Sequence, residues 1–123
     1  MTSTSKFLIL EDEPLIAMDL EFAFEDVGHS SVTAINNAEA KANMDEHGIT
    51  AAILDVNLGS GETCEPTAKE LKRRGIPFIL HTGDLNRVGE RLRALNVPVV
   101  SKPILADRLV DMLLELANRK IAE

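Results

Sequence analysis

The segment Phe7-Leu8-Ile9-Leu10-Glu11-Asp12-Glu13-Pro14 places a short apolar run directly before three acidic residues and a proline. Such a run is typical of a buried strand. Pro14 suits the first turn of a helix, where the N–H group that it lacks would have no partner in any case. The segment therefore predicts a strand, an acidic turn and a helix, in that order.

The rest of the chain repeats this alternation. Short apolar runs predict strands at residues 7–10, 31–35, 51–54, 78–80 and 97–100, and helical spacing predicts helices at residues 14–27, 38–47, 66–74, 85–94 and 105–122. Asn36 is placed to cap the second helix. Alternating strands and helices form a parallel sheet covered on both faces. At this length the prediction is a doubly wound α/β fold of the flavodoxin-like type.

Composition agrees with one folded domain. The chain has 123 residues, 45% of them hydrophobic and 27% charged, and a single cysteine. That length matches one ordinary domain, and a lone cysteine allows no internal disulfide. The sequence has neither an apolar stretch long enough to span a membrane nor the layout of a signal peptide. We therefore expect a cytoplasmic protein, with residues 1–123 forming one domain and no output domain.

Charge is unevenly distributed along the chain. The net charge is -7, with 2 basic and 12 acidic side chains in residues 1–62 but 11 basic and 8 acidic ones in residues 63–123. An acidic chain is poorly suited to nucleic acid, which needs clustered positive charge. The acidic half could hold a cation, and both halves are also compatible with ordinary solvated surface.

Polar residues follow most of the predicted strands, and doubly wound folds bind ligands at the carboxyl ends of their strands. A Glu-Asp-Glu turn after the first strand disfavours a nucleotide phosphate, and the chain has no Gly-rich phosphate loop. Clustered carboxylates favour Mg²⁺, which often bridges to a phosphoryl oxygen. A carboxylate can accept a phosphoryl group, and a lysine can neutralise its charge. The residues expected at this edge are Glu11, Asp12, Asp55, Asn57, Thr82, Gly83, Asp84, Ser101 and Lys102.

Four motifs together resemble the CheY-like response regulator receiver domain over the whole chain. They are Leu8-Ile9-Leu10-Glu11-Asp12-Glu13-Pro14, Leu54-Asp55-Val56-Asn57-Leu58, Thr82-Gly83 and Ser101-Lys102-Pro103. The resemblance implies a sheet of order 2-1-3-4-5 and a cis bond between Lys102 and Pro103. It also implies these roles: Asp55 as phosphoacceptor; Asp12 and the Asn57 backbone carbonyl as Mg²⁺ ligands with Asp55; Glu11 acting mainly through metal-bound water; and Thr82 and Lys102 contacting the phosphoryl group. Mn²⁺ or Ca²⁺ are alternative ions.

The sequence departs from the common receiver pattern in its loops and in its switch. Leu58-Gly59-Ser60-Gly61-Glu62 replaces the usual Met-Pro and Asp-Gly elements, and the chain resembles a divergent member of a subclass with a Phe-Ala-Thr-Gly-Xaa-Tyr motif. Val99 stands where receivers usually carry the switch aromatic. We therefore expect switching at Gly83 and in the helix after it. In receivers, the positions of Asn57 and Asp84 tune hydrolysis of the acyl phosphate.

The resemblance also implies partners. A sensor histidine kinase, for example of the HWE/HisKA2 type, or a histidine phosphotransfer protein would donate the phosphoryl group, and an unknown output protein would read it. Leu15, Met18 and Phe22 form an apolar stripe opposite the predicted core face of the first helix, where a kinase helix would dock. We expect no nucleic acid or membrane partner.

Three alternatives remain at this stage. A pseudo-receiver would bind partners without being phosphorylated. A small aspartyl-phosphate phosphohydrolase would turn over a substrate, although Asn57 stands where that chemistry normally has a second acid. A flavodoxin would bind flavin, which the acidic first turn disfavours. As a receiver, the chain would catalyse only its own phosphorylation and dephosphorylation, so we do not expect it to be an enzyme in the usual sense.

Overall fold

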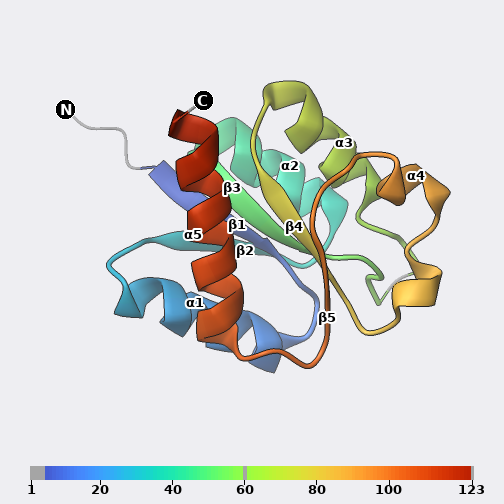
Figure 1. Cartoon of the computed structure of the whole chain (residues 1–123), viewed down its shortest axis with the longest axis horizontal. Coiled ribbons are helices and arrows are strands. Elements are labelled where there is room, and N and C mark those ends of the chain that lie inside the picture. The colour runs from blue at the N-terminus through green and yellow to red at the C-terminus, as the bar shows by residue number, and fades with distance from the viewer. Residues whose placement is uncertain (1–4, 60, 123) are drawn as a thin grey trace.

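A computed structural model describes residues 5–59 and 61–122. Five parallel strands form one sheet in the order β2-β1-β3-β4-β5, with helices on both faces (Figure 1). The elements are β1 Ser5–Leu10, α1 Pro14–Asp26, β2 Ser31–Ala34, α2 Asn37–Glu46, β3 Gly48–Asp55, α3 Glu65–Arg74, β4 Phe78–Thr82, the 3₁₀ turn η1 Leu85–Arg87, α4 Glu90–Arg93, β5 Val99–Ser101 and α5 Ala106–Ala122. The predicted fold class and strand order are confirmed.

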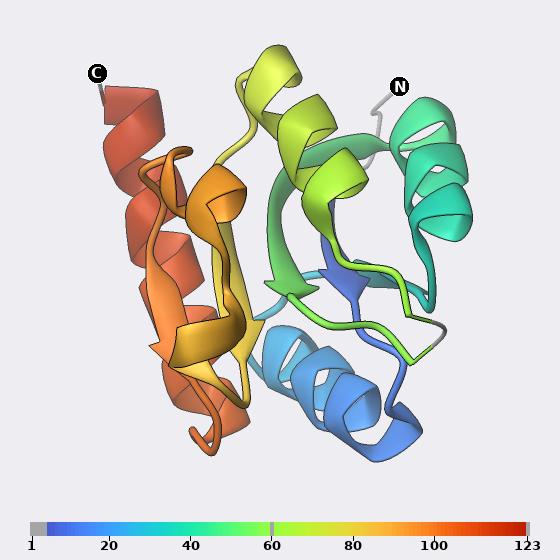
Figure 2. The ribbon, with the colours of Figure 1, turned by 90° about the vertical axis from the view of Figure 1, so that its right-hand side faces the viewer.

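Alternation along the central strands divides the core into two layers. Leu8 and Leu10 of β1 pack with residues of α2, α3 and α4, whereas Phe7 and Ile9 pack with α1 and α5. Figures 1 and 2 show the same division, with α1 and α5 on one side of the sheet and α2 and α3 on the other. Because β1 and β3 are covered on both faces where they are buried, Phe7–Leu10 and Ala51–Leu54 are continuous apolar runs that end at the carboxyl edge of the sheet.

Local signals set most helix boundaries where they were predicted. The Asn36 side chain accepts a hydrogen bond from the Glu39 amide at 2.8 Å and caps α2. Pro14 lies in the first turn of α1. Gly75 ends α3 with φ 73°, a left-handed conformation that glycine adopts without steric cost.

The prediction of one continuous helix over residues 85–94 is wrong. The segment forms the turn η1 and then a four-residue α4, separated by Gly89 with φ 87° and ψ 156°. That backbone conformation cannot continue a helix. The Asp84 side chain also accepts a hydrogen bond from the Asn86 amide at 2.9 Å, which caps the short turn instead of a longer helix.

All five strands differ from the predicted ones at one end or both: β1 begins earlier, at Ser5, β2 ends earlier, at Ala34, and β4 extends to Thr82. The third strand begins at Gly48 and not at Ala51, and the last strand is Val99–Ser101, so Val97 precedes it. Within residues 5–59 and 61–122, no helix has the length and apolar character needed to cross a membrane.

Candidate functional site

Three carboxylates meet where the two central strands end. Glu11 and Asp12 follow β1, and Asp55 is the last residue of β3, so the parallel register brings the three together. Each offers one oxygen, and these oxygens lie within 4.8 Å of one another. Glu11 is 2% exposed and Asp55 is 6% exposed. Buried carboxylates this close need compensating positive charge.

Lys102 supplies part of that charge from the end of β5. Its Nζ lies 3.4 Å from Glu11 Oε1 and 3.4 Å from Asp55 Oδ1. Its backbone amide donates to the Thr82 carbonyl at 2.7 Å, which holds the strand end in place, and the Lys102–Pro103 peptide bond is cis. Burial alone would lower the pKa of Lys102, but Glu11 and Asp55 outweigh it and the pKa is raised. The lysine therefore remains charged.

One lysine does not neutralise the cluster. Burial raises the pKa of Asp55 to about 7, and the negative charge of Glu11 adds to this effect, while Lys102 opposes it. Burial and the neighbouring carboxylate thus disfavour the ionised form of Asp55. Another cation beside it would favour the ionised, nucleophilic form.

An opening of about 410 Å³ lies above these carboxylates. It brings together most of the residues that the sequence placed at this edge. Glu11 lies beneath the opening, buried, where it accepts a hydrogen bond from the Glu13 amide at 3.1 Å. The residues that line it are Asp12, Glu13, Asp55, Asn57, Leu58, Gly59, Gly83, Asp84, Arg87 and Lys102.

Thr82 ends β4 next to this opening, and its side chain is fully buried. Its hydroxyl oxygen accepts a hydrogen bond from the Asp84 amide at 3.1 Å and lies 3.2 Å from the Asp84 carbonyl oxygen. The hydroxyl therefore belongs to the turn that begins with Gly83. A hydrogen bond from this hydroxyl to a phosphoryl oxygen would replace the one that it donates to the Asp84 carbonyl.

Comparisons with known proteins identify the family. No protein-family model matches the chain, and no curated protein matches it. Among solved structures, SdrG from Sphingomonas melonis Fr1 is 42% identical; the match covers 96% of this chain and 99% of that one, with a TM-score of 0.77. The chain belongs to the CheY-like response regulator receiver family.

Two further structures agree with this assignment. The BeF3-activated conformation of SdrG, attributed to Pseudomonas melonis Fr1, is 41% identical over 95% of this chain and 99% of that chain, with a TM-score of 0.73. A CheY-like receiver domain protein from Methanospirillum hungatei JF-1 is 22% identical over 98% of both chains, with a TM-score of 0.83, and supports the fold. As a receiver, the chain has a role in two-component signalling.

Two residues of the receiver site escaped the sequence analysis. Gly59 donates its amide hydrogen to Asp12 Oδ2 at 2.8 Å, and Arg87 lines the opening with its Nε 3.7 Å from Asp84 Oδ2. A glycine shortly after Asp55 was a signal that the backbone approaches another group closely. Arg87 gave no signal, because its place depends on how η1 turns.

His81 is a buried neighbour of this receiver site. It pairs with Asp55 in the β3–β4 register, and neither ring nitrogen has a hydrogen-bond partner among the residues that the structure describes. Burial lowers its pKa to about 4, with Lys102 acting in the same direction. The imidazole is therefore neutral at physiological pH and adds no charge to the cluster.

The remaining predicted positions lie outside the opening. Leu15, Met18 and Phe22 are 74%, 40% and 54% exposed on α1, which agrees with the expected apolar stripe. Val99 is half-buried and packs against the core layer formed with α2, α3 and α4. An aliphatic side chain therefore occupies the receiver's usual aromatic position.

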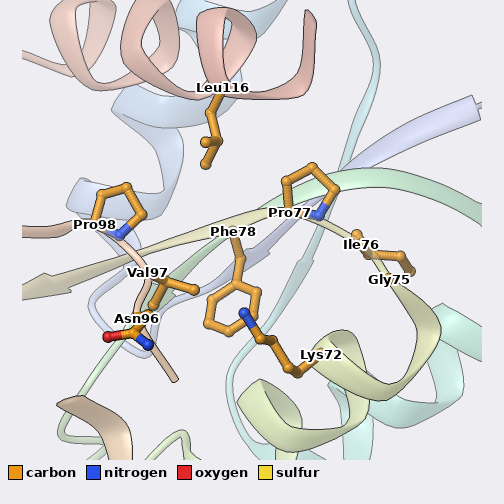
Figure 3. A pocket seen from close by; sticks show the side chains of 9 residues that line it. All are labelled: Lys72, Gly75, Ile76, Pro77, Phe78, Asn96, Val97, Pro98 and Leu116. Atoms are coloured by element: carbon orange, nitrogen blue, oxygen red, sulfur yellow. The ribbon is translucent and has the colours of Figure 1, made fainter. Parts of the chain in front are cut away.

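A second pocket, of about 220 Å³, lies at the opposite edge of the sheet (Figure 3). Its walls come from the segments before β4 and β5 and from Leu116 of α5, and Lys72 is its only charged lining residue. It contains no group of convergent acids or bases. The convergent carboxylates and Lys102 lie instead at the carboxyl edge.

Proposed function

We propose that this receiver is a Mg²⁺-dependent phosphoacceptor that takes a phosphoryl group onto Asp55 from a sensor histidine kinase or a histidine phosphotransfer protein. The observation that carries the proposal is the Asp55 carboxylate, which lines an opening between the Asp12 and Lys102 side chains. Phosphoryl transfer needs little more than positioning and charge neutralisation, and these residues can supply both.

The donor set suits a small divalent cation. Carboxylate and carbonyl oxygens are the ligands that Mg²⁺ prefers. Burial and the charge of Glu11 raise the pKa of Asp55, and a cation beside the carboxylate would oppose both effects. Asp12, Asp55 and the Asn57 carbonyl would hold the ion, with Glu11 acting mainly through its bound water. Mn²⁺ or Ca²⁺ could replace it. Such an ion neutralises the negative charge of the phosphoryl oxygens.

In the transfer step, a carboxylate oxygen of Asp55 forms a bond to phosphorus as the N–P bond of a phosphohistidine breaks. The electron pair of that bond stays on the imidazole nitrogen, which takes up a proton. Lys102 compensates the charge of the bound phosphoryl oxygens. The Thr82 hydroxyl donates to one of them instead of to the Asp84 carbonyl. Water later cleaves the acyl phosphate, with Asn57 and Asp84 at the opening to tune that rate.

The signal would pass to an output protein, or the chain would act as a phosphate shuttle or sink in the cytoplasm. Movement of Thr82 would alter Gly83 and η1, since they share one turn. The donor would dock on the exposed Leu15, Met18 and Phe22 stripe, which lies on the helix that begins beside the acidic cluster.

The test is intact-mass measurement after incubation with acetyl phosphate, with and without Mg²⁺, beside an Asp55→Asn control. We expect a gain of one phosphoryl group that requires Mg²⁺ and is absent in the control. Addition of BeF3, used for SdrG in a solved structure, should shift the amide resonances of Thr82, Gly83 and their neighbours. No mass gain together with no BeF3 response would reject the proposal and favour a pseudo-receiver.

A further inference from the structure

Asp12 is held differently from the other two carboxylates of the cluster. Glu11 and Asp55 both lie 3.4 Å from Lys102 Nζ. Asp12 instead accepts a hydrogen bond from the backbone amide of Gly59, with 2.8 Å between Gly59 N and Asp12 Oδ2. The two residues are 47 positions apart in the chain, so the β3–α3 loop sets this contact.

Only glycine leaves room for the Asp12 carboxylate at this distance. A Cβ atom built on Gly59 would lie 2.5 Å from Asp12 Oδ2 and 3.6 Å from Asp12 Cγ. Its φ is not in the left-handed region, so the backbone at this position is open to other residues. Alanine there would displace the mobile end of the Asp12 side chain, and neither the backbone nor the core would have to move.

The described part of the loop is fixed by its own hydrogen bonds. The Leu58 amide donates to the Glu62 carbonyl at 2.9 Å, and Asn57 forms an antiparallel bridge with Thr63. The Gly61 amide donates to the Leu58 carbonyl at 3.2 Å. The loop therefore has a defined path on both sides of the Asp12 contact.

The loop is also tied to the start of α2. Glu62 Oε1 accepts from the backbone amide of Asn37 at 3.1 Å and from its Nδ2 at 2.6 Å. Asn37 Nδ2 also donates to the Thr63 carbonyl at 2.9 Å, and the buried Thr67 hydroxyl donates to Asn37 Oδ1 at 2.6 Å. A carboxylate at a helix N-terminus is stabilised by the helix dipole. These contacts hold Gly59 against Asp12.

We infer that the Gly59 amide is a positioning group for the divalent-cation site. It fixes one carboxylate oxygen of Asp12, so that the other is presented to the ion with little freedom to rotate. The inference rests on the proposed function, because it concerns the ion that phosphorylation would need. Groups that orient metal ligands in this way typically change metal affinity about 10–100-fold when they are removed.

The test compares Gly59→Ala with Gly48→Ala, whose added Cβ meets nothing within 4 Å and whose φ is also not left-handed. Isothermal titration calorimetry with MgCl2 should give an affinity at least about tenfold weaker for Gly59→Ala and unchanged for Gly48→Ala. Both variants should unfold cooperatively near the temperature of the unchanged chain. Equal Mg²⁺ affinity in Gly59→Ala and the unchanged chain would overturn the inference and leave the proposed function standing.

A second readout follows the hydrogen bond without metal. In the unchanged chain, the Gly59 amide resonance should have the chemical shift of a hydrogen-bonded amide, and it should move toward that of a free amide in Asp12→Ala. If Gly59→Ala fails to fold, Glu62→Ala removes the acceptor of both Asn37 hydrogen bonds and loosens the loop while Gly59 and Asp12 remain, and it should also weaken Mg²⁺ binding. Unchanged binding in that variant would overturn the inference. Failure of the unchanged chain to bind Mg²⁺ would overturn the metal part of the proposed function, and this inference with it.

Discussion

The two halves of the carboxyl edge are built differently. At the ends of β1 and β3, one carboxylate oxygen from each of Glu11, Asp12 and Asp55 lies within 4.8 Å of the others. Each carboxylate also contacts Lys102 or a backbone amide. The other half runs from Thr82 to the end of β5, and its elements are short: α4 has four residues and β5 has three. The Thr82 hydroxyl in this half accepts a hydrogen bond from the Asp84 amide of the same turn.

Under the proposed function, this difference would assign phosphoryl transfer to the acidic half and signal transmission to the other. The acidic half is arranged before any ligand binds, which lowers the cost of organising the site. The other half has a short helix, a left-handed Gly89 and Val99 in place of an aromatic side chain. A change on phosphorylation would therefore use the loop and η1, since no aromatic ring is present to rotate. The predictions below test each half separately.

The largest effect is expected for Lys102→Ala, which removes the ammonium group that neutralises the acidic half. The pKa of Asp55 should rise further, because Lys102 lowers it, and the phosphoryl oxygens would lose their cationic partner. The rate of phosphorylation by acetyl phosphate should fall by about 100-fold. Lys72→Ala, a lysine at the opposite edge of the sheet, should leave the rate unchanged; equal rates for the two variants would remove Lys102 from the proposed chemistry.

The next effect concerns stability. The native pKa of Asp55, about 7, lies above its ordinary value of 3.8, so the folded state binds the proton more tightly than the unfolded state. The free energy of unfolding should therefore fall as pH rises from about 4 to 7 without divalent cation. Asp55→Asn removes this loss and should be more stable at pH 8 by at least about 1 kcal/mol, or roughly 4 °C in Tm.

Thermal unfolding at pH 4 and pH 8 checks this prediction. The difference in Tm between Asp55→Asn and the unchanged chain should be small at pH 4. Saturating Mg²⁺ should reduce that difference at pH 8. Asp45→Asn is the matched control, because Lys41 and Arg74 lower the pKa of Asp45. That substitution should not stabilise the protein. A difference in Tm for Asp55→Asn that is independent of pH would show that the acidic half carries no unfavourable charge.

Most of the fold could be predicted from the sequence, because buried parallel strands read as short apolar runs and helices carry local end signals. Such signals affect only the helix turn in which they lie, as Pro14 and Asn36 do at helix starts and Gly75 does at a helix end. The length of the fourth helix was predicted wrongly because the apolar spacing continues through Gly89. A pattern of side chains does not reveal the backbone conformation of that glycine.

The site was less predictable where it depends on loops. Strand ends must converge in a parallel sheet, so Glu11, Asp12, Asp55 and Lys102 were found from their positions alone. The Gly59 contact arises from a loop path that is set by Glu62 and Asn37, residues without a motif. Resemblance to receivers supplied the chemical roles, which spacing could not.

A smaller effect should come from the docking stripe. Phe22→Ala removes an exposed ring from α1 and should slow transfer from a phosphorylated kinase by about fivefold, the equivalent of roughly 1 kcal/mol at an interface. The rate with acetyl phosphate should stay the same, because the acidic half is untouched. Ile35→Ala, an equally exposed apolar residue after β2, is the control; equal losses in both variants would argue against docking through the stripe.

The smallest effect is expected at Asp84, where the two halves meet. Its carboxylate caps η1 through the Asn86 amide at 2.9 Å and pairs with Arg87 at 3.7 Å, so its oxygens are only partly available to orient attacking water. Asp84→Ala should lengthen the lifetime of the acyl phosphate by only about two- to threefold, well below the 10²-fold or more of a fully engaged general base. Loss of phosphoryl signal in intact mass after removal of acetyl phosphate measures that lifetime.

Arg87→Ala separates the possible causes, since it frees the Asp84 carboxylate and should shorten the lifetime of the acyl phosphate if Asp84 orients water. An unchanged lifetime in both variants would confine control of hydrolysis to the acidic half, with Asn57 as the remaining candidate.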